Sequence, residues 1–141
     1  MSVSQQLVYV VDDSADYRFL VGQVFKRFLK QYRVQYYESG TALCAQLGTE
    51  PVDMPFLILM DNEMPGLTGP QTLSFLKGHP YWQKVPIIII SSNTSPEEKQ
   101  RAYTLGAASY LFKPLGIEEH KEQLSSVCQY WSEAGVTAVL R

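Results

Sequence analysis

Five short apolar runs, each followed by a segment of helical period, constrain the fold of this chain most strongly. The runs cover residues 7–11, 34–37, 56–60, 85–90 and 109–112. Apolar runs that alternate with amphipathic stretches are typical of repeated strand–helix units, in which helices cover both faces of a parallel sheet. The sequence therefore predicts an α/β fold with a five-stranded parallel sheet.

The segments between the runs carry helix start and stop signals. Ser39 predicts an N-cap for a second helix that ends near Gly48, and a third helix is expected over about residues 70–78. The segment 95–98 has the pattern of a capping box with proline at the first helical position. We expect the last helix over residues 117–134. The first helix has an apolar face at helical spacing, formed by Tyr17, Leu20, Val21, Val24, Phe25 and Phe28.

Length and composition fit one domain over residues 1–141, with a core over about 6–134 and a short C-terminal tail over 135–141. Cys44 and Cys128 stand far apart, which argues against a zinc site. A net charge of −2 without a basic block argues against direct binding of nucleic acid. The apolar runs are too short to cross a membrane and no signal peptide is evident, so we expect a cytoplasmic protein without membrane insertion.

Polar residues follow the apolar runs where a parallel sheet binds ligands, outside the carboxyl ends of its strands. They are Asp12, Asp13, Asp61, the pair Ser91 and Ser92, and Lys113. Crowded carboxylates repel one another unless a cation neutralises them, and Mg²⁺ takes oxygen ligands while leaving room for a phosphoryl group. A carboxylate can also be a nucleophile for phosphorus, with a lysine and a hydroxyl balancing the phosphoryl oxygens. The pattern therefore predicts Mg²⁺-dependent phosphoryl chemistry at this edge.

Four motifs in this order resemble the receiver domain of two-component response regulators, in its stand-alone, chemotaxis-regulator-like form. They are VVDDS at 10–14, DNEMPGLTG at 61–69, IIIISS at 87–92 and YLFKP at 110–114. Asp61 and Ser91 are 30 residues apart, and Ser91 and Tyr110 are 19 apart, as in that family. The resemblance covers about residues 6–134 and implies a flavodoxin-like, doubly wound (βα)5 fold.

The resemblance implies a chemical role for each residue at the strand ends. Asp61 would be the phosphoacceptor. The Mg²⁺ ligands would be the Asp13 and Asp61 carboxylates and the Glu63 backbone carbonyl, with Asp12 acting mainly through a bound water. Lys113 would pair with the phosphoryl group, and a cis peptide bond before Pro114 would aim that lysine inward.

The resemblance also implies a switch and a variable rim. Ser91 would move toward the phosphoryl group and vacate space into which Tyr110 turns, which would alter the surface near Arg101 and Tyr103. Glu63 and Asn93 would form the rim around the water that attacks the phosphoryl group. His79 and His120 show no partner pattern, and we expect both at the surface.

The function implied is a phosphoacceptor signalling domain that catalyses only its own phosphotransfer and autodephosphorylation. The donor would be a sensor histidine kinase or a histidine phosphotransfer protein, and the output would be binding to an unidentified protein or to a second copy. Three alternatives remain: a degenerate receiver that binds partners without phosphorylation, a phosphatase with an aspartyl nucleophile, and a flavodoxin-like cofactor module. The phosphatase needs Asp-x-Asp, whereas this chain has Asp61-Asn62-Glu63. The cofactor module would bring a phosphate against Asp12 and Asp13.

Overall fold

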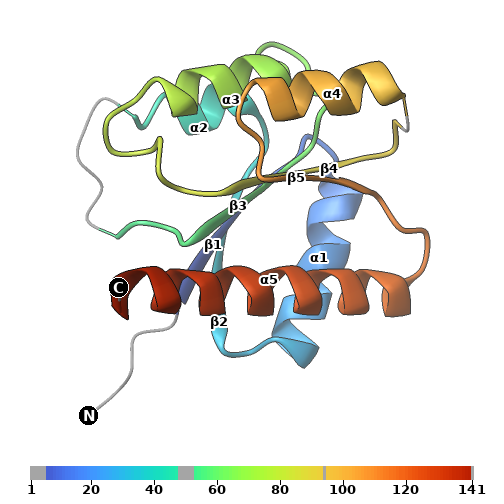
Figure 1. Ribbon diagram of the computed structural model, residues 1–141. Coiled ribbons are helices and arrows are strands. Elements are labelled where there is room, and N and C mark those ends of the chain that lie inside the picture. Colours follow the sequence, from blue (N-terminus) through green and yellow to red (C-terminus); the bar gives the residue numbers. More distant parts are fainter. Residues whose placement is uncertain (1–5, 48–52, 94, 141) are drawn as a thin grey trace.

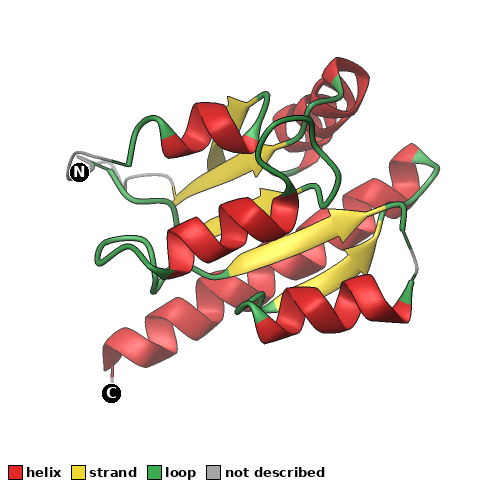
Figure 2. Cartoon of the chain, turned by 90° about the horizontal axis from the view of Figure 1, so that it is seen from above, coloured by secondary structure: helices red, strands yellow, loops and turns green. Residues whose placement is uncertain are grey.

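The computed structural model describes residues 6–47, 53–93 and 95–140, and strands and helices alternate through these ranges. In chain order they are β1 Gln6–Val11, α1 Ala15–Phe28, β2 Tyr32–Tyr37, α2 Gly40–Cys44, β3 Leu57–Met60, α3 Gly69–Lys77, β4 Ile87–Ser91, α4 Pro96–Thr104, β5 Ser109–Phe112 and α5 Ile117–Leu140. Helices α2, α3 and α4 cover one face of the sheet, and α1 and α5 cover the other (Figure 1). Figure 2 shows this layering from above.

The five strands form one parallel sheet in the order β2-β1-β3-β4-β5. The order reverses direction at β1, because β2 lies on one side of it and β3, β4 and β5 on the other. This confirms the α/β prediction and its flavodoxin-like, doubly wound arrangement. Such a reversal opens a crevice at the carboxyl ends of β1 and β3, where ligands bind in open α/β sheets.

The central strands β1, β3 and β4 are largely apolar because both faces of the sheet are buried there, whereas the edge strands β2 and β5 are partly exposed. In β1, Tyr9 and Val11 pack with α2, α3 and α4, whereas Val8 and Val10 pack with α1 and α5. The same alternation runs through β3 and β4. Each central strand therefore contributes to two cores, which explains the continuous apolar runs.

Some observed helix boundaries differ from the predicted ones. Helix α2 ends at Cys44, and Gly48, where the sequence predicted its end, lies outside the described residues. Helix α5 continues to Leu140, so the prediction that it ends near residue 134 is wrong. A glycine inside a helix costs only about 1 kcal/mol relative to alanine, so Gly135 alone is a weak stop signal. None of the helices in the described ranges is long and apolar enough to cross a membrane.

Helix α3 begins directly against the loop that follows β3. Thr68 is its N-cap and forms a capping box with Gln71. A Cβ atom on Gly69 would lie 2.7 Å from the Cα of Asn62, so only glycine permits this close approach. The start of α3 therefore fixes the loop that immediately follows Asp61.

Candidate functional site

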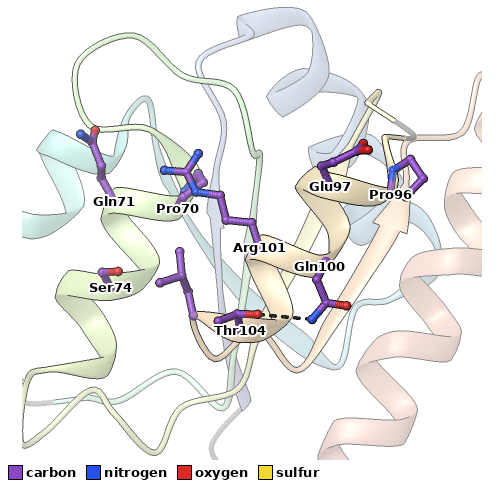
Figure 3. A pocket seen from close by; sticks show the side chains of 9 residues that line it. Pro70, Gln71, Ser74, Pro96, Glu97, Gln100, Arg101 and Thr104 are labelled. Carbon is purple, nitrogen blue, oxygen red and sulfur yellow. Dashed lines mark hydrogen bonds between the residues drawn. The ribbon is translucent and has the colours of Figure 1, made fainter.

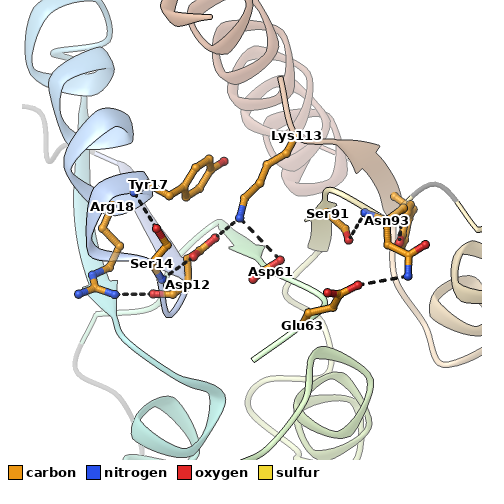
Figure 4. Close-up of polar contacts among 10 residues, drawn as sticks. Asp12, Ser14, Tyr17, Arg18, Asp61, Glu63, Ser91, Asn93 and Lys113 are labelled. Carbon is orange, nitrogen blue, oxygen red and sulfur yellow. Dashed lines mark hydrogen bonds and ion pairs between the residues drawn. The ribbon is translucent and has the colours of Figure 1, made fainter. Parts of the chain in front are cut away.

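The carboxyl ends of β1, β3, β4 and β5 meet at one edge of the sheet. Backbone pairing continues just past the strands, since the Asp12 N–H donates to the Tyr37 carbonyl and the Asp61 N–H donates to the Val11 carbonyl. Figure 4 shows Asp12, Asp61, Ser91 and Lys113 converging at this edge. The structure thus brings together residues that lie up to 101 positions apart in the sequence, from Asp12 to Lys113.

Three carboxylates gather in this crevice. One oxygen each from Asp12, Asp13 and Asp61 lies within 4.8 Å of the others. Asp12 and Asp61 are buried, with 1% and 8% of their surface exposed, whereas Asp13 is exposed. Carboxylate oxygens at this density, with one member open to solvent, are a donor set able to bind a divalent cation.

Lys113 supplies the positive charge beside this cluster. Its Nζ lies 2.8 Å from Oδ2 of Asp12 and 3.8 Å from Oδ1 of Asp61. Asp12 is held from its other side, because the Ser14 N–H donates to Oδ1 at 2.8 Å and the Arg18 guanidinium donates to the Asp12 carbonyl at 2.6 Å. Asp12 is therefore fixed in place, and it pairs with Lys113 more closely than Asp61 does.

The pKa of Asp61 is raised to about 6. Burial is the largest cause, and the neighbouring Asp12 carboxylate is the next; Lys113 and the Glu63 backbone N–H partly offset them. The ionised form of Asp61 is therefore disfavoured even with Lys113 nearby, and further positive charge in the site would favour it.

The peptide bond before Pro114 is trans, because the described residues contain no cis peptide bond. The expectation of a cis bond at this position is therefore wrong for this structure. Trans is the preferred isomer by about 0.5–1 kcal/mol even before proline. Lys113 reaches both Asp12 and Asp61 with that bond trans.

Asn93 links the residues assigned to the rim and the switch. Its side-chain amide donates to Glu63 at 3.2 Å, and its backbone N–H donates to Ser91 Oγ at 3.0 Å. The Tyr110 hydroxyl donates to the Asn93 carbonyl at 2.8 Å, and Tyr110 is only 7% exposed. Tyr110 is thus already turned inward. Ser91 is buried at the end of β4, whereas Ser92 is exposed.

The capping box predicted at the start of α4 forms only in part. Ser95 caps the helix and accepts from the Glu98 N–H. The Glu98 side chain instead accepts from the amide of Asn62, at 3.0 Å, across the crevice. Asn62 is the residue after the predicted phosphoacceptor and is buried, so this contact ties the Asp61 loop to α4. The contact between Asn62 and Glu98 could not be predicted from sequence spacing, because 36 residues separate them.

Tyr17 and His120 lie next to the site in the structure, and neither was predicted there from the sequence. The Tyr17 ring lies under Lys113, with Nζ 4.2 Å from its centroid, and also contacts the ring of His120. His120 is 2% exposed, so the expectation that it is a surface residue is wrong. Its spacing from Leu124 and Cys128 on the buried face of α5 was the available signal. His79 is half-buried and accepts from the Tyr81 N–H.

A second hollow runs between α3 and α4 (Figure 3). Pro70, Gln71 and Ser74 line it from α3, and Pro96, Gln100 and Arg101 line it from α4. None of the three clustered aspartates lines this groove. A smaller hollow beside it shares Pro70, Gln71 and Arg101 and reaches Glu63 and Asn93 at the site rim. The rim and the α3–α4 groove are therefore neighbours on the surface.

The fold and the site together define a phosphoacceptor signalling module rather than a conventional enzyme. Five parallel strands bring an acidic cluster and a lysine to the switch point of the sheet. Residues 8–125 match the family model described as the response regulator receiver domain, and the chain belongs to this family. Receiver domains are phosphorylated by histidine kinases.

The chain is similar in sequence to proteins of different lengths. The chain is 30% identical over 127 residues to a probable cyclic di-GMP phosphodiesterase of Vibrio cholerae, with 90% of this chain and 27% of that protein covered. It is 26% identical over 128 residues to the probable methanogenesis regulatory protein FilR2 of Methanothrix harundinacea, with 89% of this chain and 83% of that protein covered. The chain thus spans only about a quarter of the Vibrio protein.

Solved structures share the fold. The chemotaxis response regulator CheY4 of Vibrio cholerae is 27% identical, with a TM-score of 0.74 over 88% of this chain and 99% of that chain. The phosphorylated cyanobacterial phytochrome response regulator RcpA has a TM-score of 0.83 at 18% identity, over 93% of this chain and 96% of that one. The Mn²⁺-bound form of response regulator Rcp1 has a TM-score of 0.78 at 22% identity, over 89% of this chain and 94% of that one.

Proposed function

We propose that this chain accepts a phosphoryl group on Asp61 in a Mg²⁺-dependent reaction and signals by changed protein binding. The observation that carries the proposal is the gathering of three carboxylates within 4.8 Å beside the Lys113 ammonium. An Asp61 oxygen attacks phosphorus, and the P–N bond of a donor phosphohistidine breaks as the P–O bond of an acyl phosphate forms. The leaving imidazole nitrogen keeps the electron pair and takes a proton.

Asp13, Asp61 and the Glu63 backbone carbonyl would hold Mg²⁺, with Asp12 acting mainly through a bound water. The donor set supports this, because all these ligands are oxygens and the exposed Asp13 opens the cluster to solvent. When bound, the ion supplies positive charge for the carboxylates and for the phosphoryl oxygens. That charge favours the ionised form of Asp61, whose pKa is otherwise raised.

Lys113 and Ser91 would stabilise the charge that develops on the phosphoryl oxygens. Lys113 needs only to shift from Asp12 toward Asp61, because its Nζ already lies 3.8 Å from an Asp61 oxygen. The Ser91 hydroxyl is buried at the end of the adjacent strand β4, and it would donate to a phosphoryl oxygen. Glu63 and Asn93 would then govern how a hydrolytic water reaches the acyl phosphate.

The donor would be a sensor histidine kinase or a histidine phosphotransfer protein, met in the cytoplasm. The output would be read on the surface of α4, β5 and α5, near Arg101, Tyr103 and Tyr110, by an unidentified protein or a second copy of this chain. Asn93 supports this route, because it joins Ser91 to Tyr110 through two hydrogen bonds. The net charge of −2 does not favour direct binding of nucleic acid.

The test is phosphorylation by acetyl phosphate with Mg²⁺, read by intact mass. The wild-type chain is expected to gain one phosphoryl mass, and Asp61→Asn is expected to gain none. Asp16→Asn is the matched control, because Asp16 is an exposed acid in the first turn of α1. Labelling that persists in Asp61→Asn would reject the assignment. A chain that takes no phosphoryl group from any donor and still binds its partner would be a degenerate receiver.

A further inference from the structure

We propose that Tyr17 is a positioning residue for phosphoryl transfer. The face of its ring holds the Lys113 ammonium beside the carboxylates, and the buried ring of His120 holds Tyr17 in turn. This inference rests on the proposed function, because the group that Lys113 would serve is the phosphoryl group on Asp61.

Tyr17 is fixed at the start of α1, where the helix leaves the site. Its backbone N–H donates to the Oγ of Ser14, the N-cap of α1, at 3.1 Å. Ser14 in turn donates its own N–H to Asp12. The acid that binds Lys113 and the ring beneath Lys113 are thus joined through one capping residue, as Figure 4 shows.

The contact between Tyr17 and Lys113 has the geometry of a cation–π interaction. Nζ lies 4.2 Å from the ring centroid, well within the range in which an ammonium is attracted to the negative face of an aromatic ring. Burial and the charges of Asp12 and Asp61 raise the pKa of the Tyr17 phenol. The phenol therefore stays neutral, and its ring face supplies the attraction.

His120 supports the Tyr17 ring from helix α5. The two ring centroids are 5.7 Å apart and the planes are tilted by 54°. His120 Nδ1 lies 2.6 Å from the Gly116 carbonyl, so Nδ1 carries the proton that it donates there and the ring is fixed. Its Nε2 is buried and has no hydrogen-bond partner within the described residues. His120 therefore packs against Tyr17 with its Nε2 unpaired among the described residues.

Such an arrangement suits a lysine that must move a short distance. Lysine has a long flexible stem, and the Asp12 and Asp61 carboxylates compete for the charge of Lys113. A hydrogen-bond acceptor would hold the ammonium at one point, whereas the face of a ring attracts it over a broad area. Lys113 can thus pass from Asp12 toward a phosphoryl group on Asp61 without losing the Tyr17 contact. Tyr17 also lines a small, mostly apolar cavity together with Asp12 and Asp61.

The experiment compares Tyr17→Phe, which keeps the ring, with Tyr17→Leu and Tyr17→Met, which remove it. Phosphorylation by acetyl phosphate is expected to stay within about twofold of wild type in Tyr17→Phe and to slow by about three- to tenfold in the other two. The metal-free protein gives a second readout, the ring-current shift of the Lys113 ε-CH₂ protons by NMR. Tyr17→Phe should retain this shift, and Tyr17→Leu and Tyr17→Met should lose it.

Phe28→Leu is the matched control. Phe28 lies on the same helix and carries its own ammonium contact, with Lys121 Nζ 4.4 Å from its ring centroid, away from the acidic cluster. This variant should remove the ring-current shift of Lys121 and leave phosphorylation unchanged. His120→Ala should weaken the Lys113 shift in the same direction as Tyr17→Leu, and an unchanged shift would remove His120 from the proposal.

Two results would overturn the inference. The first is a Lys113 shift or a phosphorylation rate in Tyr17→Leu and Tyr17→Met equal to that of wild type. The second is a loss in Tyr17→Phe as large as in Tyr17→Leu, which would assign the effect to the hydroxyl. If the wild-type chain takes no phosphoryl group, the proposed function fails, and the metal-free Lys113 shift still decides whether Tyr17 positions the lysine.

Discussion

The Lys113 ammonium pairs with Asp12, at 2.8 Å from its Oδ2, within the cluster of carboxylates able to bind a divalent cation. A divalent cation and Lys113 therefore compete for the same carboxylates. Lys113→Ala is expected to bind Mg²⁺ about three- to tenfold more tightly, because the competing charge is gone, and to accept phosphate more slowly. Calorimetric titration with Mg²⁺ measures the first effect and intact mass the second. Lys121→Ala is the control, and an unchanged Mg²⁺ affinity in Lys113→Ala would contradict the competition.

Asp13 should contribute more than other exposed acids to cation binding. It is the solvent-facing member of the cluster, whereas the buried Asp12 is already paired with Lys113. Asp13→Asn is expected to lower Mg²⁺ affinity by about tenfold or more, because a direct carboxylate ligand is lost. Asp16→Asn, three residues away in the first turn of α1, should titrate like wild type. Equal affinities for Asp13→Asn and wild type would show that the coordination scheme is wrong.

Asp61 should make the metal-free fold less stable as the pH rises. Its folded pKa of about 6 exceeds its ordinary value of 3.8, so the folded state binds the proton more tightly than the unfolded state. The free energy of unfolding should therefore fall between about pH 4 and pH 6 and then level off. Asp61→Asn should remove this contribution to the pH dependence. Without metal at pH 7, its free energy of unfolding should exceed that of wild type by about 1–3 kcal/mol, and Mg²⁺ should make this difference smaller.

Urea unfolding of both proteins across this pH range, in chelator and in Mg²⁺, gives the measurement. Asp53→Asn is a suitable control, because Asp53 is an exposed carboxylate paired with Arg33. A difference between wild type and Asp61→Asn that is constant from pH 4 to pH 7 would contradict the raised pKa of Asp61.

The strands and the acidic cluster could be predicted from the sequence because each rests on a local signal. A strand buried on both faces has an uninterrupted apolar run, and the strand predicted at residues 56–60 is observed as β3, Leu57–Met60. Residues at the carboxyl ends of parallel strands must share an edge, so Asp12, Asp61 and Lys113 follow from the strand pattern alone.

The remaining site features depend on tertiary contacts that no local pattern encodes. Glu98 has the spacing of a capping-box residue, yet its side chain binds Asn62, because the start of α4 packs across the Asp61 loop. Tyr17 lies on the apolar face of α1, and nothing in its spacing distinguishes a core ring from one beneath a lysine. The cis bond expected at Pro114 was inferred from family resemblance, and local sequence does not determine that isomer.

Glu63 and Asn93 should act on the phosphoryl lifetime as a pair. Their side chains are hydrogen-bonded at 3.2 Å, so removing either one also releases the other. We expect Glu63→Ala and Asn93→Ala to change the dephosphorylation rate, with the double variant differing from the sum of the single effects. Decay of the phosphorylated chain after removal of the donor, followed by intact mass, gives the rates. If both single variants and the double variant dephosphorylate at the wild-type rate, neither Glu63 nor Asn93 affects the approach of the water.

The effect of phosphorylation should reach α4 and β5 through two hydrogen bonds that connect these elements to the site. The Tyr110 hydroxyl donates to the Asn93 carbonyl, and Asn62 donates to Glu98. A phosphoryl group adds about −1.5 to −2 charges beside them, which should draw Ser91 toward it and release the Asn93 backbone N–H. Because Tyr110 is already turned inward, we expect a shift in the position of α4 rather than a large rotation of that ring.

Amide shifts with and without beryllofluoride and Mg²⁺ test this readout. Changes are expected across Pro96–Thr104 and Ser109–Phe112. They should shrink in Tyr110→Phe and in Glu98→Ala, because each variant removes one of the two hydrogen bonds, and Tyr130→Phe, an exposed ring on α5, is the control. If the changes stay within the Asp61 pocket, or if Tyr110→Phe and Glu98→Ala respond like wild type, the signal does not leave through Asn93 and Asn62.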